Sequence, residues 1–141
     1  MNYRILARKY RPKSFNDLVG QEILVEIFRQ AFDNNKLAQA YLLTGIRGVG
    51  KTTTARIIAK AFNCEKYEKP SFNICNKCKS CISIDNGNNL DVLEVDAASK
   101  TGVDNIRELI ETVVYSPNEN RYKIYIIDEI HMLSIPAFNA L

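Results

Sequence analysis

One eight-residue run has the spacing of a phosphate-binding loop, G-x-x-x-x-G-K-[ST]. Its residues are Gly45, Ile46, Arg47, Gly48, Val49, Gly50, Lys51 and Thr52. Glycines let the backbone curl so that its N–H groups point at phosphate oxygens. In such a loop the lysine reaches the β- and γ-phosphates and the final hydroxyl binds Mg²⁺. We therefore expect Lys51 and Thr52 to bind a nucleotide with Mg²⁺, and Arg47 to face solvent.

Two carboxylates, Asp128 and Glu129, follow the apolar run 124–127. An acid at the end of a buried strand is the usual second Mg²⁺ ligand of a phosphate-loop protein, so we assign this role to Asp128. Glu129 is then the general base that polarises the attacking water. His131 is the single histidine. We expect it to contact polar neighbours rather than to bind zinc, because four cysteines already complete a metal site.

The four cysteines have the spacing C-x10-C-x2-C-x2-C, at Cys64, Cys75, Cys78 and Cys81. Four thiolates give closed tetrahedral coordination, which is typical of structural zinc. An iron–sulfur centre is an alternative, but the usual cysteine followed by proline is missing after Cys81. Unligated structural thiols are the other alternative. A closed zinc site would have no catalytic role, because no coordination position stays open.

The hydrophobic periodicity predicts alternating strands and helices. Strands are expected at 40–44, 92–96 and 123–127, helices at 21–34, 51–63 and 103–114 and from Ser134 on, a turn at 116–120 and a loop-rich insertion at 64–89. The apolar face of the first helix consists of Ile23, Leu24, Ile27, Phe28 and Ala31, and that of the second of Ala55, Ile58, Ala59 and Phe62. Such alternation predicts an α/β fold with a parallel sheet covered by helices.

Composition places the chain among globular proteins. It has 141 residues, of which 46% are hydrophobic and 25% charged, and a net charge of +3 that is too small to indicate a nucleic-acid partner. No run approaches the ~20 apolar residues of a membrane helix, and no secretory signal is present. Pro12 interrupts any mitochondrial presequence helix. We therefore expect the protein to be located in the reducing cytoplasm, where cysteines bind metal more often than they form disulfides.

Together these motifs resemble the gamma/tau subunit family of bacterial DNA polymerase III. The resemblance covers the whole chain and rests on Leu6-Ala7-Arg8-Lys9-Tyr10-Arg11-Pro12-Lys13-Ser14-Phe15, Leu18-Val19-Gly20-Gln21-Glu22, the phosphate loop, the cysteines, Asp96-Ala97-Ala98-Ser99 and Asp128-Glu129-Ile130-His131-Met132-Leu133. It implies a P-loop ATPase of the AAA+ type, which opens the ring-shaped sliding clamp and places it on primed DNA.

The resemblance also implies further site residues, ligands and partners. Arg11, Pro12, Val19 and Gly20 would lie near the adenine and ribose of ATP, and zinc would bind the four cysteines. Residues 1–141 would form the N-terminal part of the ATPase domain, with a zinc-binding module inserted at 64–89. Partners would be the other clamp-loader subunits of a hetero-oligomer, the clamp and, through the complex, DNA, with no membrane.

The α/β pattern continues up to Leu141, so we expect a piece of a longer protein. Family members continue with sensor residues, an arginine finger, a helical lid and an oligomerisation domain. We therefore expect weak nucleotide binding and negligible turnover from this chain alone. Two other functions stay open: a helicase, because residues 128–131 match a D-E-x-H box, and a non-catalytic zinc-binding interaction module.

Overall fold

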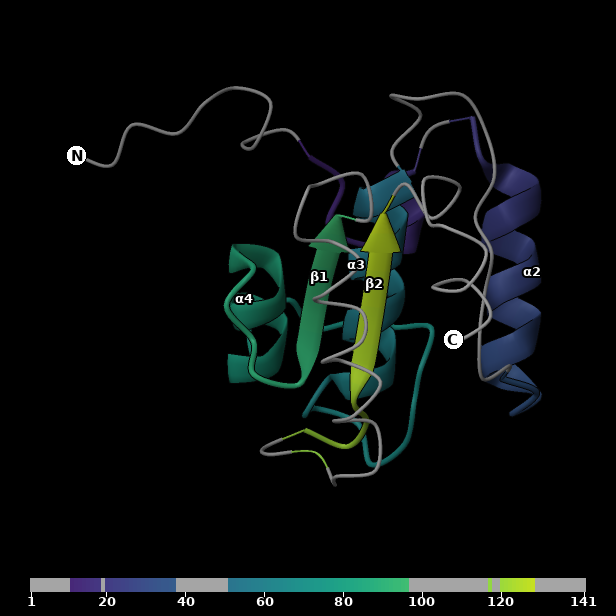
Figure 1. The fold of residues 1–141 in the computed structure, drawn as a ribbon. Coiled ribbons are helices and arrows are strands. Elements are labelled where there is room, and N and C mark those ends of the chain that lie inside the picture. The colour runs from purple at the N-terminus through teal and green to yellow at the C-terminus, as the bar shows by residue number, and fades with distance from the viewer. Residues whose placement is uncertain (1–10, 19, 38–50, 97–116, 118–119, 129–141) are drawn as a thin grey trace, which may run out of the picture. The chain divides into compact units, whose positions relative to one another are not determined.

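The computed structural model describes residues 11–18, 20–37, 51–96, 117 and 120–128. In these ranges the elements are η1 (Phe15–Asp17), α2 (Glu22–Asp33), α3 (Lys51–Asn63), α4 (Lys79–Asn86), β1 (Val92–Asp96) and β2 (Ile124–Asp128). The chain divides into two compact units, Met1–Asp85 and Asn86–Leu141. The helices named above belong to the first unit, apart from the last residue of α4, and the two strands to the second. Figure 1 shows these helices and strands.

An aromatic cluster forms the core of the first unit. The ring of Phe15 stacks on those of Phe28 and Phe72, with centroids 5.5 and 4.7 Å apart. The other buried members of the cluster are Phe32, Ile57, Ile58 and Ala61. Phe15 is only 1% exposed and is the buried residue of η1. Burial of this ring therefore attaches the short η1 turn to helices α2 and α3.

Helix α2 confirms the first predicted helix. Its predicted apolar face is correct at Phe28 but wrong at Ile23 and Ile27. Ile23 and Ile27 of the predicted face are 81% and 57% exposed. The buried residues of α2 are Phe28, which belongs to the predicted face, and Phe32, which does not. Apolar residues occur on more than one side of this helix, and contact of both rings with Phe15 determines which side packs inside.

Helix α2 ends at the two asparagines, as predicted. Asn34 is the C-cap, and Asn35 has the left-handed backbone conformation with φ 54°. The N–H of Asn35 donates to the carbonyl of Phe32 at 3.3 Å, and that of Lys36 donates to the carbonyl of Ala31 at 2.9 Å. These two bonds form a Schellman motif, in which asparagine takes the place usually held by glycine.

Helix α3 is confirmed at its predicted bounds and is buried along most of its length. Its buried residues are Thr53, Thr54, Ile57, Ile58, Ala59, Lys60, Ala61 and Asn63. The predicted face is therefore correct at Ile58 and Ala59, whereas Ala55 and Phe62 are only half-buried. Full burial of Lys60 is unusual for a charged side chain.

The predicted loop-rich insertion at 64–89 contains a helix that the sequence pattern did not predict. Helix α4 covers Lys79–Asn86, and its buried residues are Ser80, Cys81 and Ile84. Serine, asparagine and aspartate favour turns over helix interiors, and the sequence pattern of this segment therefore predicted a loop. An eight-residue helix of this composition depends on tertiary contacts for its stability.

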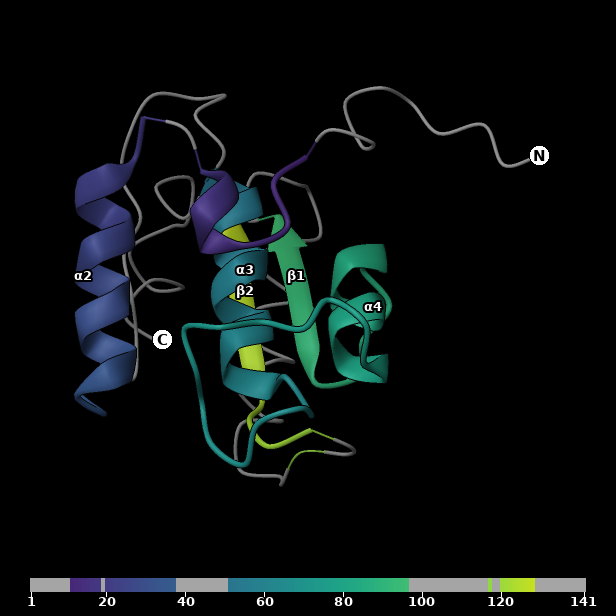
Figure 2. The ribbon, with the colours of Figure 1, turned by 180° about the vertical axis from the view of Figure 1, so that it is seen from behind.

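The second unit contains a parallel pair of strands, as the predicted sheet requires. Val92 of β1 pairs with Ile124 of β2, and the register continues to Asp96 and Asp128. Figures 1 and 2 show the two strands side by side and pointing the same way. The observed bounds of β2 are one residue later than predicted, so Asp128 is its last residue.

A polar cluster joins the beginnings of the two strands. Asn89 Oδ1 accepts hydrogen bonds from the N–H groups of Asp91 and Val92 and from Asn120 Nδ2, at 2.8, 3.1 and 2.7 Å. Asp91, which is fully buried, accepts from the Asn120 N–H through Oδ2 and from the Ile124 N–H through its carbonyl, both at 2.7 Å. These bonds fix the strand register, because they join residues before β1 to residues before and within β2.

Other predicted elements lie outside the described residues. They are the strand at 40–44, the helix at 103–114, most of the turn at 116–120 and the helix from Ser134 on. Among the helices that the structure describes, none is both long and apolar enough to cross a bilayer.

Candidate functional site

The four cysteines come together in one cluster in the first unit. Their Sγ atoms all lie within 4.8 Å of one another, and those of Cys75 and Cys81 are 4.0 Å apart. Cys64 is the first residue after α3, Cys81 lies in α4, and the other two lie in the loop between these helices. Cys64 and Cys81 are buried, whereas Cys75 and Cys78 are half-buried. All four thiols are free, so no disulfide competes for them.

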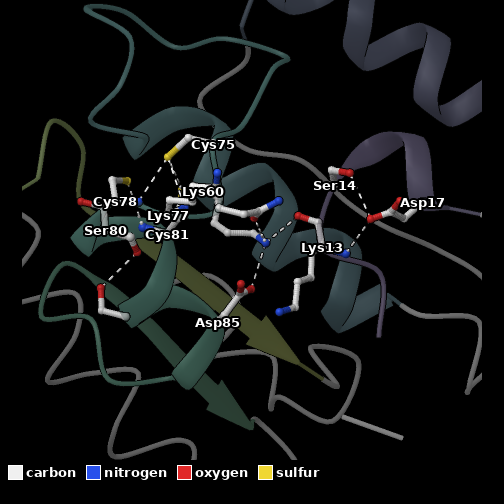
Figure 3. Close-up of polar contacts among 12 residues, drawn as sticks. Lys13, Ser14, Asp17, Lys60, Cys75, Lys77, Cys78, Ser80, Cys81 and Asp85 are labelled. Carbon is white, nitrogen blue, oxygen red and sulfur yellow. Dashed lines mark hydrogen bonds and ion pairs between the residues drawn. The ribbon is translucent and has the colours of Figure 1, made fainter. Parts of the chain in front are cut away.

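Backbone N–H groups point at two of the sulfur atoms. Cys75 Sγ accepts from the N–H groups of Lys77 at 3.4 Å and Cys78 at 3.2 Å. Cys78 Sγ accepts from those of Cys81 at 3.4 Å and Glu65 at 3.5 Å. Bonds of this kind stabilise negative charge on sulfur, which is the form that binds a metal. Figure 3 shows the N–H groups of the loop and of α4 directed at Cys75 and Cys78.

This geometry fits a single tetrahedral metal ion. A zinc–sulfur bond of about 2.3 Å in a tetrahedron places the sulfur atoms about 3.8 Å apart. The distance of 4.0 Å between Cys75 and Cys81 Sγ is close to that value. A cluster of several iron atoms would hold the four sulfurs further apart, because the inorganic core lies between them. The four sulfur donors and the short distances between them therefore favour one soft ion such as Zn²⁺.

Burial and hydrogen bonding give the thiols different pKa values. Burial raises the pKa of Cys64 and that of Cys81. Burial also opposes ionisation of Cys75, but hydrogen bonds from the N–H groups of Lys77 and Cys78 and from the side chains of Cys64 and Cys78 together outweigh it and lower the pKa of Cys75 to about 6. At neutral pH the metal-free cluster therefore contains a thiolate at Cys75 beside neutral thiols at Cys64 and Cys81.

Two polar contacts that the sequence reasoning missed support the cluster. Ser80 Oγ donates to Glu65 Oε1 at 2.9 Å, which ties the residue after Cys64 to α4. Lys60 Nζ lies 2.9 Å from Asp85 Oδ1, so it joins α3 to α4. One sequence signal was present: Lys60 lies three residues after Ile57 and four before Cys64, so it is on the same side of the helix as these two residues.

Of the predicted phosphate loop, the structure describes Lys51 and Thr52. Both are half-buried, and Lys51 is the first residue of α3. A helix beginning at the lysine is the arrangement that a phosphate loop requires, since the first N–H groups of a helix have no internal partner and attract anions. Residues 45–50 lie outside the described residues.

The remaining predicted nucleotide residues are described only in part. Asp128 ends β2 in the second unit, while Glu129 and His131 lie outside the described residues. Arg11 and Pro12 are half-buried and come just before η1. Gly20 is exposed and has φ 75°, a conformation that favours glycine, whereas Val19 lies outside the described residues.

Comparison with known proteins identifies relatives over the whole chain. A subunit gamma of DNA polymerase III from Buchnera aphidicola subsp. Schizaphis graminum is 50% identical over 143 residues, covering all of this chain and 38% of the relative. The tau subunit from Bacillus subtilis is 50% identical and the tau/gamma subunit from Haemophilus influenzae 48% identical over 141 residues. Each alignment covers all of this chain, but only 25% and 20% of those relatives.

The chain thus spans between one fifth and two fifths of the length of these relatives. The family described as DNA polymerase III, delta subunit, matches residues 20–141. These findings confirm the resemblance that the sequence motifs indicated. The chain belongs to the family DNA polymerase III, delta subunit, and is similar over its whole length to the gamma and tau subunits of that polymerase.

Proposed function

We propose that this chain is the nucleotide-binding part of a clamp-loader subunit of DNA polymerase III, an AAA+ ATPase that acts in DNA replication. The observation that supports this most is the 45–50% identity over the whole chain to proteins named as gamma or tau subunits. The partners of such a subunit are the other clamp-loader subunits, the sliding clamp and primed DNA. These relatives favour the clamp loader over the helicase alternative, because none of those reported above is named as a helicase.

In this proposal the start of α3 receives the phosphates of ATP. The N–H groups of its first turn and the ammonium of Lys51 stabilise the negative charge of the β- and γ-phosphates. The hydroxyl of Thr52 and the carboxylate of Asp128 would hold Mg²⁺, which neutralises phosphate charge when bound. Glu129 would accept the proton of the attacking water. Arg11, Pro12, Val19 and Gly20 would contact adenine and ribose.

The cysteine cluster has a structural role in this proposal. Zn²⁺ would bind Cys64, Cys75, Cys78 and Cys81, all of which lie within bonding reach of one ion. With four sulfur ligands the ion has no open position for water or substrate. The ion would instead stabilise the segment between α3 and α4, which has few apolar residues of its own.

Two substitutions separate binding from hydrolysis. Lys51→Ala should weaken Mg-ATP binding by about 10- to 100-fold, because it removes a charge-assisted contact to phosphate. Glu129→Gln should retain binding and lower hydrolysis by about 10²- to 10⁴-fold, because the proton acceptor acts only on the attacking water. Calorimetric titration of the 141-residue chain measures binding, and a steady-state assay of the subunit at the length of its relatives measures hydrolysis.

A matched control is Lys69→Ala, since Lys69 is an exposed lysine of the same unit. This variant should bind Mg-ATP like the unaltered chain. Equal loss of binding in the Lys51 and Glu129 variants would contradict the two assigned roles. Failure of the unaltered chain to bind Mg-ATP at millimolar concentration would contradict the proposal itself.

A further inference from the structure

Lys60 has one partner for each of the three N–H bonds of its ammonium group. Nζ lies 2.6 Å from the carbonyl oxygen of Lys13, 2.9 Å from Oδ1 of Asn76 and 2.9 Å from Oδ1 of Asp85. Figure 3 shows these three contacts converging on Nζ from different segments of the chain. The side chain is 0% exposed, and a buried ammonium is tolerated only when its charge is paired and its donors are satisfied.

Two of these partners belong to the cysteine cluster. Asn76 is the residue after Cys75, and its φ of 57° is the left-handed conformation that directs the loop around the sulfurs. Asp85 lies one helical turn after Cys81 in α4. An ion that joins Cys75 to Cys81 would therefore hold Asn76 and Asp85 at a fixed separation, and with them two of the three acceptors around Lys60.

The third partner belongs to the segment at residues 11–18. The Lys13 N–H donates to Asp17 Oδ2 at 3.2 Å, and Ser14 Oγ donates to the same oxygen at 3.1 Å. The carbonyl that Lys60 contacts is thus part of a small hydrogen-bonded turn, and Arg11 and Pro12 directly precede that turn. The turn is held at two points, by the buried ring of Phe15 and by Lys60.

We infer that Lys60 is a positioning residue that couples metal binding at the cysteine cluster to the order of residues 11–18 and thereby to nucleotide affinity. The nucleotide part of this inference rests on the proposed function. Zn²⁺ fixes Asn76 and Asp85, these hold the ammonium in place, and the ammonium holds the Lys13 carbonyl. Lys60 also lies on the helix that begins at Lys51, roughly 13 Å away along its axis. By reciprocity, nucleotide should raise the affinity for Zn²⁺ by the same factor.

Hydrogen exchange tests the first part without any nucleotide. The reporters are the amides of Lys13, Asp17 and Leu18, which donate to Asp17 Oδ2 and to the carbonyls of Ser14 and Phe15. Added Zn²⁺ should slow their exchange about tenfold in the unaltered chain, within the usual range of coupling between two sites. Lys60→Met, which replaces the ammonium by an unbranched apolar side chain one atom shorter, should abolish this response. The control Lys36→Met, at an exposed lysine of α2's C-terminal end, should retain it.

The second part is tested by the affinity for Mg-ATP with and without Zn²⁺. Zn²⁺ should tighten binding about tenfold in the unaltered chain and in Lys36→Met, but should have no effect in Lys60→Met. If the role of Lys60 is merely structural, Lys60→Met will weaken Mg-ATP binding but leave the ratio of the affinities with and without Zn²⁺ unchanged. That result would overturn the inference. If the zinc-saturated unaltered chain binds no Mg-ATP, the proposed function fails, while hydrogen exchange still decides whether Lys60 couples the two segments.

Asn76→Gly covers the case in which Lys60→Met does not fold. Glycine adopts φ 57° without strain, and the ion pair of Lys60 with Asp85 remains. Loss of one neutral hydrogen-bond partner should reduce the tenfold effect of Zn²⁺ on exchange to about threefold. An unchanged response to Zn²⁺ in the folded Asn76→Gly chain would overturn the inference.

Discussion

Asp96 and Asp128 are paired across the two parallel strands, so β1 and β2 end level with each other at one edge of the sheet. In parallel sheets, ligands bind outside the carboxyl ends of the strands. The polar cluster of Asn89, Asp91 and Asn120 fixes this register from the opposite end of the strands. A slip of one residue would move Asp128 away from the level of Asp96 and reverse the faces of the whole strand.

The first prediction concerns Mg²⁺ at this edge. Asp128→Asn should reduce the enhancement of nucleotide affinity by Mg²⁺ about tenfold or more, because an amide is a much weaker Mg²⁺ ligand than a carboxylate. Glu94→Gln is the control, since Glu94 is an exposed carboxylate in the middle of β1. Titration of a fluorescent ATP analogue at several Mg²⁺ concentrations measures the effect. The same loss in both variants would show that the general charge of the second unit, and not Asp128, supports Mg²⁺.

The second prediction concerns the metal itself. The unaltered chain, purified without oxygen, should contain about one zinc per molecule, and Cys81→Ser should lose most of it. Ile82→Ser is the control, because Ile82 is exposed and lies next to Cys81 in α4. Elemental analysis measures the content. Stoichiometric iron with visible colour would instead support the iron–sulfur alternative.

The third prediction is the pH dependence of zinc affinity. Metal binding requires thiolates, so Zn²⁺ must displace the protons that burial keeps on Cys64 and Cys81 at pH 7.5. Affinity should therefore rise with pH by at least about 100-fold per unit, since at least two protons leave. Below pH 6 the dependence should steepen, because Cys75, whose pKa is about 6, is then also protonated.

Competition with a zinc chelator between pH 5.5 and pH 8, corrected for the protonation of the chelator, measures this slope. Calorimetry in buffers with different ionisation enthalpies gives the number of protons released independently. Zinc affinity that does not change with pH would contradict the ionisation states assigned to Cys64 and Cys81.

The fourth prediction concerns the core of the first unit. Phe15→Ala should lower the free energy of unfolding by ~3–5 kcal/mol, because it removes a buried ring that contacts Phe28, Phe32 and Phe72. Ile23→Ala should change it by less than ~0.5 kcal/mol, since Ile23 is 81% exposed. Urea denaturation of zinc-saturated protein measures both. A larger effect at Ile23 would show that the side of α2 that carries Ile23 is packed as well.

Much of the fold was predictable because the relevant signals are local. The bounds of α3, the end of α2 at Asn34 and the strand Val92–Asp96 follow from periodicity and from end signals within a few residues. Helix α4 was not predictable in this way. Its serine, asparagine and aspartate residues favour turns, and its stability depends on Cys81 in the cluster and on Asp85 beside Lys60.

The candidate sites also combine features that the sequence predicts with features that depend on tertiary contacts. Sequence alone determined the four-thiol donor set and the family, because residue type and spacing are properties of the chain, and it predicted the phosphate-loop residues, which stay a prediction. Only the tertiary structure decided that α2 buries Phe28 rather than Ile23, and that Lys60 lies inside with its charge paired. The physical reason is that burial depends on partners distant in sequence. Phe28 packs on Phe15, and Lys60 meets Lys13 and Asp85, and no local pattern specifies these contacts.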